Sequence, residues 1–190
     1  TTGDDNTAVG YNSLGANTTG AGCIAIGSYA LDANTTGGNI AIGRNALGSN
    51  TTGTLNTALG YDALFTNVDG DNSTAVGYQA LYSQEPASNV DMYNVMVGHT
   101  AGYGLTTGIR NVGVGASVLQ GAVTGNDNTA MGHAALAANT TGGEQTAVGS
   151  LALDANTTGT ENTAFGFSAL TSNTTGNSNT ALGRKALFTN

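Results

Sequence analysis

Apolar residues recur along this chain at fixed positions in a phrase that repeats about every 17 residues. The residue before a recurrent Gly is always large and apolar, and the residue two places earlier is always Thr, Ile or Val. Between these two stands Ala in nine copies, Gly113 in one and Met96 in one. Apolar and β-branched residues at a period of two are typical of a β-strand. The pattern therefore predicts a short strand in every repeat.

The recurrent Gly, called the anchor glycine below, allows the repeats to be counted. Successive anchors are 17 residues apart, except for one spacing of 16 and one of 21. Eleven copies make residues 1–190 a single array, and the extra residues fall in 82–94, an inserted loop that holds the only Pro, Pro86. The anchors are Gly10, Gly27, Gly43, Gly60, Gly77, Gly98, Gly115, Gly132, Gly149, Gly166 and Gly183.

Leu stands four places after the anchor in ten copies, and the turn phrase NTTG usually follows. One repeat is too short to bury its apolar row, but stacked repeats bury a continuous Val/Ile/Leu stripe and pair each strand with the next. We predict an all-β fold, a parallel β-solenoid (β-roll or β-helix) of eleven coils of about 17 residues. Each coil has room for two short strands and two turns, although one helical turn after the anchor is an alternative.

Asn recurs at two positions, one before the strand and one before TTG. In register, each set forms a ladder in which side-chain amides bond to the coils above and below. Cys23 replaces Asn in the first set, as a small buried filler. NTT is also an acceptor sequence for N-glycosylation, with ladder and turn as the alternative reading. The candidate glycosylation sites are Asn17, Asn34, Asn50, Asn139, Asn156 and Asn173.

The small residues of the strand suggest an oligomer. The residue after the anchor varies freely, whereas the Ala and Gly positions hardly vary. If the large apolar residues point inward, a face of small residues points outward, as expected where a second surface packs closely. We therefore predict a homo-oligomer, a trimer around a common axis or coils stacked into a fibre. The alternative is a sharp turn that leaves no room beside the backbone.

Charge excludes two classes of partner. The chain has 12 acidic residues, four basic residues and a net charge of −8. Four scattered bases cannot form the basic surface that nucleic-acid binding needs, and an acidic surface does not suit anionic membranes. No apolar run approaches the roughly 18 residues of a membrane span. The chain opens inside a repeat phrase and not with a signal peptide, so we expect a mature piece or a fragment of a longer protein.

The phrases NTAVGYNSL, NTALGYDALFTN and NTAFGFSALTSNTTG resemble the repeats of long tail fibres of aquatic bacteriophages, over essentially the whole chain except the insertion. The TAVG and IAIG cores are more distantly similar to the head repeats of trimeric autotransporter adhesins, whose repeat is shorter and lacks NTTG. This resemblance implies a left-handed parallel β-roll, a trimer, and an extracellular location on a virion tail fibre or a cell surface.

Groups able to do chemistry are sparse. His99 and His133 lie two coils apart, roughly 10 Å at about 4.8 Å per coil, which is too far to share a metal. The DGDN phrase at Asp69 lacks the Glu that closes a calcium loop. We therefore expect no enzyme activity, no metal and no cofactor. Aromatic faces suit sugar rings, and the candidate contacts with a cell-surface glycan or receptor are Tyr11, Tyr61, Tyr78, Tyr82 and Tyr93.

The leading functional prediction is a non-enzymatic extracellular fibre, a shaft with adhesive contacts along it or at the insertion. The insertion has a tolerated loop as its alternative. A second prediction is a self-assembling, glycosylated surface filament or adhesin whose coil ends stack. A third is ice binding, which requires a flat, exposed row of Thr with few large residues beside it.

Overall fold

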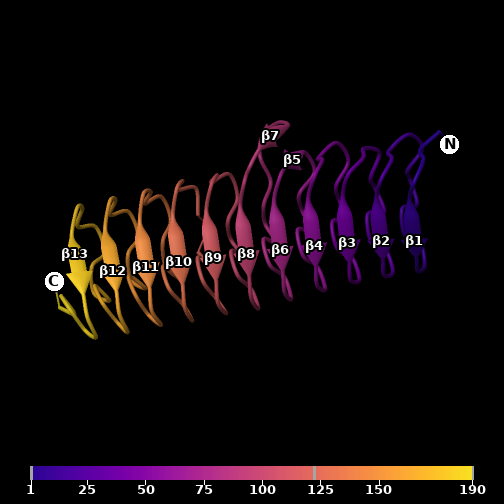
Figure 1. The fold of residues 1–190 in the computed structure, drawn as a ribbon. Coiled ribbons are helices and arrows are strands. Elements are labelled where there is room, and N and C mark those ends of the chain that lie inside the picture. The colour runs from indigo at the N-terminus through magenta and orange to yellow at the C-terminus, as the bar shows by residue number, and fades with distance from the viewer. Residues whose placement is uncertain (1, 122, 190) are drawn as a thin grey trace.

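The computed structural model describes residues 2–121 and 123–189 as a rod of stacked coils, with the two ends of the chain at opposite ends of the rod (Figure 1). Eleven three-residue strands form one parallel sheet, in which each strand pairs with that of the next coil. The predicted all-β parallel solenoid is confirmed. The strands are β1 (Thr7–Val9), β2 (Ile24–Ile26), β3 (Ile40–Ile42), β4 (Thr57–Leu59), β6 (Thr74–Val76), β8 (Val95–Val97), β9 (Val112–Val114), β10 (Thr129–Met131), β11 (Thr146–Val148), β12 (Thr163–Phe165) and β13 (Thr180–Leu182).

Strand pairing places equivalent residues of successive repeats opposite one another. Ala8 lies opposite Ala25, and Ala25 opposite Ala41, so each repeat position forms a column along the rod. The register also survives the insertion, since Ala75 of β6 pairs with Met96 of β8. The extra residues therefore bulge outward, and the columns continue past them.

The strand side chains point in the opposite direction to the one expected. Ala25 is fully buried, whereas Ile26 is 37% and Phe165 is 53% exposed. The opposite wall of the core consists of the Leu that follows the anchor, as at Leu31 and Leu47, which are also fully buried. A 17-residue coil is thin, so Leu on one side leaves room only for a methyl group on the other. The prediction that the small residues form an outer packing face is therefore wrong for Ala.

The anchor glycines occupy sharp turns pressed against the next coil. Their φ angles lie between 119° and 145°, a region that disfavours side chains. A Cβ on Gly149 would lie 2.6 Å from the carbonyl carbon of Gly166. The sequence-based alternative, a turn with no room beside the backbone, is thus correct for Gly.

The half-coil after the anchor is neither a helix nor a second strand. Asn45 has φ 55° and Leu47 has φ 50°, and left-handed residues at these two positions recur in most coils. Alternating left-handed residues cannot continue a right-handed helical turn. They tighten the turn and direct the Leu inward. Each coil described therefore has one strand in the main sheet, where two were expected to fit.

Both Asn ladders form. In the first, Asn39 Oδ1 accepts from the backbone N–H of Asn56 at 2.9 Å, and Asn39 Nδ2 donates to Gly53 O at 2.8 Å. In the second, Asn50 Nδ2 donates to Asn34 Oδ1 at 2.8 Å and to the same Gly53 O at 2.9 Å. Cys23 is a buried member of the first ladder, as predicted, with its N–H bonded to Asn6. The ladders bond backbone groups as well as one another, and so satisfy buried polar groups at the turns.

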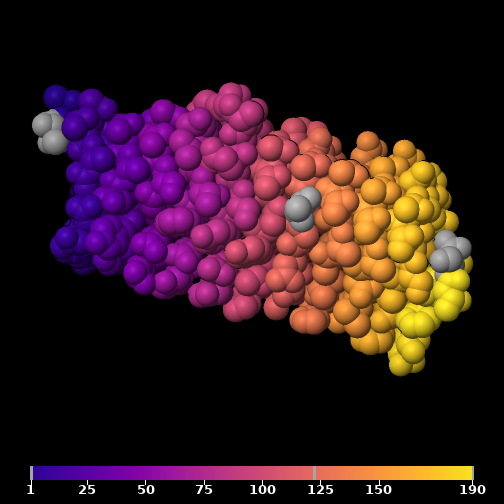
Figure 2. Space-filling model, turned by 180° about the vertical axis from the view of Figure 1, so that it is seen from behind, coloured from indigo at the N-terminus to yellow at the C-terminus, as the bar shows by residue number. Residues whose placement is uncertain are grey.

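The insertion forms a lobe on an otherwise even rod (Figure 2). Its strand β7 (Val90–Asp91) pairs with β5 (Gly70–Asp71) of the preceding coil. Asn89 reaches back and donates to Asp69 O at 3.2 Å. Met92 is fully buried beneath this pair. The lobe is therefore bonded to the rod and is not a free loop.

Candidate functional site: two aromatic columns

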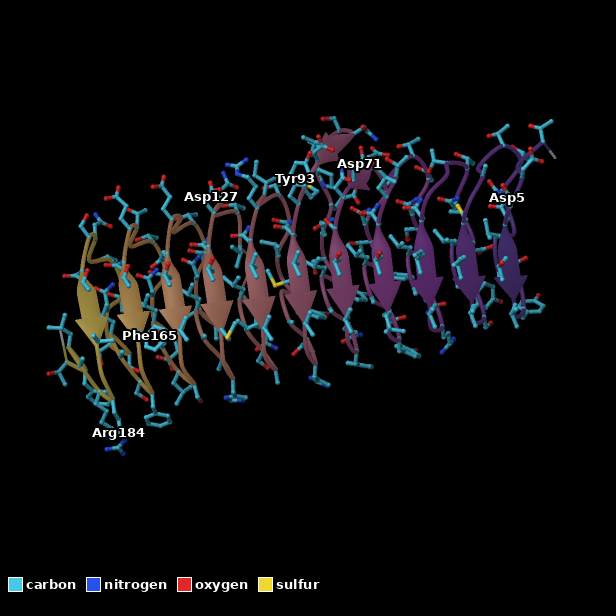
Figure 3. All side chains as sticks on the ribbon, in the orientation of Figure 1. Asp5, Asp71, Tyr93, Asp127, Phe165 and Arg184 are labelled. Carbon is cyan, nitrogen blue, oxygen red and sulfur yellow. The ribbon has the colours of Figure 1, made fainter. Side chains whose placement is uncertain are left out.

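The residue after each anchor glycine projects at one edge of the rod, the edge where Arg184 lies in Figure 3. In the central coils these residues form a first aromatic column, Arg44, Tyr61, Tyr78 and His99. The ring centroids of Tyr61 and Tyr78 are 5.6 Å apart, and those of Tyr78 and His99 are 5.1 Å apart, with nearly parallel planes. The Arg44 guanidinium lies 5.5 Å from the Tyr61 centroid and donates to Tyr61 Oη at 2.9 Å. Register alone builds this stack, because each ring falls over the next.

A second aromatic column stands four positions further along each repeat. It consists of Phe65, Tyr82 and Tyr103, whose centroids are 5.5 and 5.1 Å apart. These rings are half-buried. Burial raises the pKa of the Tyr82 phenol above its ordinary value, and the Asp62 carboxylate, Tyr103 and Tyr61 raise it further. The phenol is therefore neutral over the physiological pH range.

The structure brings together three of the five predicted Tyr contacts. Tyr61 and Tyr78 belong to the first column and Tyr82 to the second. Tyr11 lies near the N-terminal end of the rod, 72% exposed, and packs edge-to-face on Tyr29 at 5.3 Å. Tyr93 lies at the opposite edge, near the end of the insertion and in line with Asp5 and Asp127 (Figure 3). There a hydrogen bond with Asp91 raises the Tyr93 pKa.

Stacking changes what the columns can bind. A ring inside a column has both faces covered by its neighbours, so it offers only its edge and polar groups. A free face remains at the end of a column, for example where the second column stops at Phe65 and the preceding coil carries Gly48. Arg44, Phe65 and His99 were absent from the sequence-based candidates for glycan contact. Aromatic or basic residues at the repeat spacing are the signal that could have found them.

The candidate glycosylation asparagines are ladder residues. Asn34, Asn50, Asn139 and Asn156 are fully buried, Asn173 is nearly so, and Asn17 is half-buried. Asn17 Nδ2 already donates to Gly20 O at 2.9 Å, and the other five make the equivalent bond or a ladder bond. A buried amide nitrogen cannot be reached by a glycosyltransferase in the folded chain, so the structure favours the ladder interpretation.

The ionisable groups lie apart or serve the fold. His99 and His133 are exposed. Across residues 2–121 and 123–189, no three His, Cys, Asp or Glu side chains gather closely enough to hold a metal ion. In the DGDN phrase, Asp69 accepts from the Thr52 hydroxyl at 2.5 Å and Asp71 from the Thr54 N–H at 2.5 Å. These acids act as turn acceptors.

Comparison with protein-family models, with curated proteins and with solved structures finds no match for this chain. In the part of the chain that the structure describes, no helix has the length and apolar character needed to span a membrane.

Proposed function

We propose that this chain is a non-enzymatic, extracellular fibre shaft that associates with copies of itself and contacts glycans through its aromatic columns. The observation that carries the proposal is the unbroken register of eleven strands in one parallel sheet. At about 4.8 Å per coil, the rod is roughly 50 Å long. Its length depends only on the number of coils, as expected of a spacer.

The surface that we propose for self-association is not the small-residue face expected from the sequence. The outer face of the sheet carries one continuous apolar column, the last residue of each strand, which includes Ile26, Leu59, Met131 and Phe165. Large, contiguous apolar surface marks protein–protein contact sites. Another copy of the rod is the partner whose surface repeats at the same spacing. A left-handed coil and a trimer remain the expected form, with this face at the common axis in place of the small-residue face.

The ice-binding alternative is disfavoured by the same face. Seven strands begin with an outward Thr, but a large apolar residue stands two positions later in every case, as Val9 follows Thr7 and Phe165 follows Thr163. Such residues break the flat Thr row that an ice lattice requires.

Light scattering combined with negative-stain microscopy of the purified chain tests the proposal. A mass of three chains with short rods supports the trimeric shaft, and Met131→Lys with Phe165→Lys is expected to shift that mass to one chain. Long periodic filaments would favour the self-assembling filament, and a stable monomer would contradict self-association.

A further inference from the structure

We propose that the coil containing Gly48 carries a binding slot for a single neutral pyranose ring. The slot is a pocket of about 340 Å³, lined by residues that include Tyr29, Asp32, Arg44 and Phe65, with Gly48 as its floor. It lies at the end of the second aromatic column, where Gly48 occupies the position that Phe65, Tyr82 and Tyr103 fill with rings. This inference deepens the proposed glycan contact by assigning it a place and a ligand class.

Gly48 opens the slot without being needed by the backbone. The anchor Gly43, five residues earlier, has φ 135° and a Cβ there would meet the Gly60 backbone. Gly48 has no such φ, and its Cβ would lie 3.2 Å from Asn45 O and 3.3 Å from the Phe65 ring, with no contact under 3.0 Å. The equivalent backbone position accepts Phe or Tyr in the following coils. The missing side chain therefore leaves an open space beside the Phe65 ring, at the end of the stack and between Phe65 and Asp32 of the coil before Gly48.

The walls of the slot match the two faces of a sugar. Phe65 presents a ring face on which no other ring of the second column stacks, and an aromatic face packs on the C–H face of a pyranose. Around it stand Arg44, which donates, Asp32, which accepts, and Asn45, which can do both. Arg44 is held by Tyr61 Oη at 2.9 Å, and Asn45 Nδ2 donates to Asp62 at 2.9 Å, so both side chains are oriented before a ligand binds.

Size and charge narrow the ligand class. The volume is at the lower end of the range for ligand pockets, which suits one ring and not a chain of sugars. One carboxylate and one guanidinium line the pocket, so a neutral hydroxylated ring is matched, whereas an acidic sugar would approach Asp32. A ligand of this size in a shallow site is expected to bind with a dissociation constant on the order of 1 mM.

The test is a ¹H–¹⁵N NMR titration of the full chain with the methyl glycosides of glucose, galactose and mannose. We expect one of them to shift the Gly48 amide and the Asn45 side-chain amide selectively. Gly48→Phe, which supplies the missing ring, is expected to weaken binding more than tenfold. Ala137→Phe places the same ring in the same column five coils away and is expected to leave binding unchanged. Arg44→Gln, at an exposed site, is expected to weaken it about fivefold.

Absence of shifts with all three glycosides would overturn the slot, as would shifts that persist unchanged in Gly48→Phe. Shifts centred on Tyr61 and Tyr78, and insensitive to Gly48→Phe, would place the sugar on the first column instead and also reject the slot. None of these results changes the mass or shape of the rod, so failure of the slot is distinguishable from failure of the proposed shaft.

Discussion

The regular coils between Thr129 and Gly183 and the coil that contains Met96 fill the same core from different positions. In the regular coils the strand supplies Ala and the turn supplies Leu, as with Ala147 and Leu153. In the Met96 coil the strand supplies the large residue, and Gly102 replaces the turn Leu with φ 62°. A Cβ on Gly102 would lie 2.8 Å from Met96 Cγ.

The coil after Met96 also exchanges large and small core residues between strand and turn. Gly113 replaces the strand Ala opposite Met96, and a Cβ there would overlap Met96 Sδ and lie 3.0 Å from Val118 Cγ1. Val118 itself stands where nine of the other ten coils have Ala. The comparison teaches that the core conserves packed volume and not residue identity at each position. Backbone register, in contrast, is kept at every coil.

The largest expected effect comes from a substitution that disrupts the strand register in a regular coil. Gly149→Ala would place a Cβ against the Gly166 backbone, which cannot move without separating two strands. We expect a loss of more than about 4 kcal/mol in the free energy of unfolding, measured by chemical denaturation. Gly183→Ala is the control, because its φ of 119° is strained like the 132° of Gly149, but nothing lies within 4 Å of the added Cβ. Equal losses in the two variants would contradict the close-approach explanation.

The second effect tests the exchange of volume. Met96→Ala leaves a cavity and is expected to cost about 2–5 kcal/mol, whereas Met131→Ala, which truncates an outward Met, is expected to cost less than about 1 kcal/mol. Adding Gly102→Leu to Met96→Ala restores the arrangement of the regular coils. We expect the double variant to recover to within about 1 kcal/mol of the parent. Additive destabilisation would show that the two positions do not share one space.

The third prediction compares the stability lost when an asparagine of the buried ladder is truncated with that lost when a surface asparagine is truncated. Asn156 donates to Asn139 Oδ1 at 3.2 Å and to Gly159 O at 3.1 Å, and accepts from Asn173. Asn156→Ala removes these three hydrogen bonds among buried groups, so we expect a loss of about 2–3 kcal/mol. Asn177→Ala, which removes an exposed acceptor, is the control and should cost less than about 1 kcal/mol. Similar losses would argue against a role for ladder burial.

The coil that contains Met96 has Leu105, and not Asn, at the ladder position that Asn156 occupies in its own coil. Its turn carbonyl, Gly108 O, still accepts from Asn94 of the other ladder at 2.8 Å. That bond explains how the ladder is interrupted there without leaving the carbonyl unpaired.

The smallest effect concerns pH. Burial raises the pKa of Asp154, in a regular coil, and of Glu85, in the insertion, above their ordinary values of 3.8 and 4.5. A raised folded pKa means that the protonated form is favoured in the fold, so stability increases as pH falls through the folded pKa towards the ordinary value. We expect the melting temperature to rise slightly from pH 7 to about pH 4.5. Asp154→Asn should flatten the rise, and a fall over this range would contradict the prediction.

The exposed Asp127 works in the opposite sense. Its hydrogen bond with Arg110 lowers its pKa, so the stability it contributes is lost only as pH falls further, below its ordinary value of 3.8. The two effects therefore act in separate pH windows and can be distinguished in one titration.

Repeat spacing made most of the fold predictable, because a fixed period translates directly into columns. The period predicted the parallel sheet, the Asn ladders and the place of Cys23. It did not predict which side of the strand faces inward, since Ala25 and Ile26 are both apolar and only the width of the coil decides between them. The tight turn at Leu47 was also missed, because Leu seldom adopts a left-handed φ and the sequence of the repeat gives no signal for one at this position.

The candidate site was predicted less well for a related reason. Tyr61, Tyr78 and Tyr82 were chosen because aromatic faces suit sugar rings, but whether a face is free to bind a ligand depends on the residue one repeat away. Gly48 and Phe65 define the slot by their relation across two coils, and neither residue is informative alone.

The columns also have a consequence for how such a protein changes over generations. Because most coils meet their neighbours through the same anchor, ladder and Leu contacts, duplication or loss of one repeat's worth of codons creates no new kind of junction. The length of the rod can then change in small steps by recombination within the gene. The surface residues of each coil can meanwhile diverge independently of the backbone that carries them.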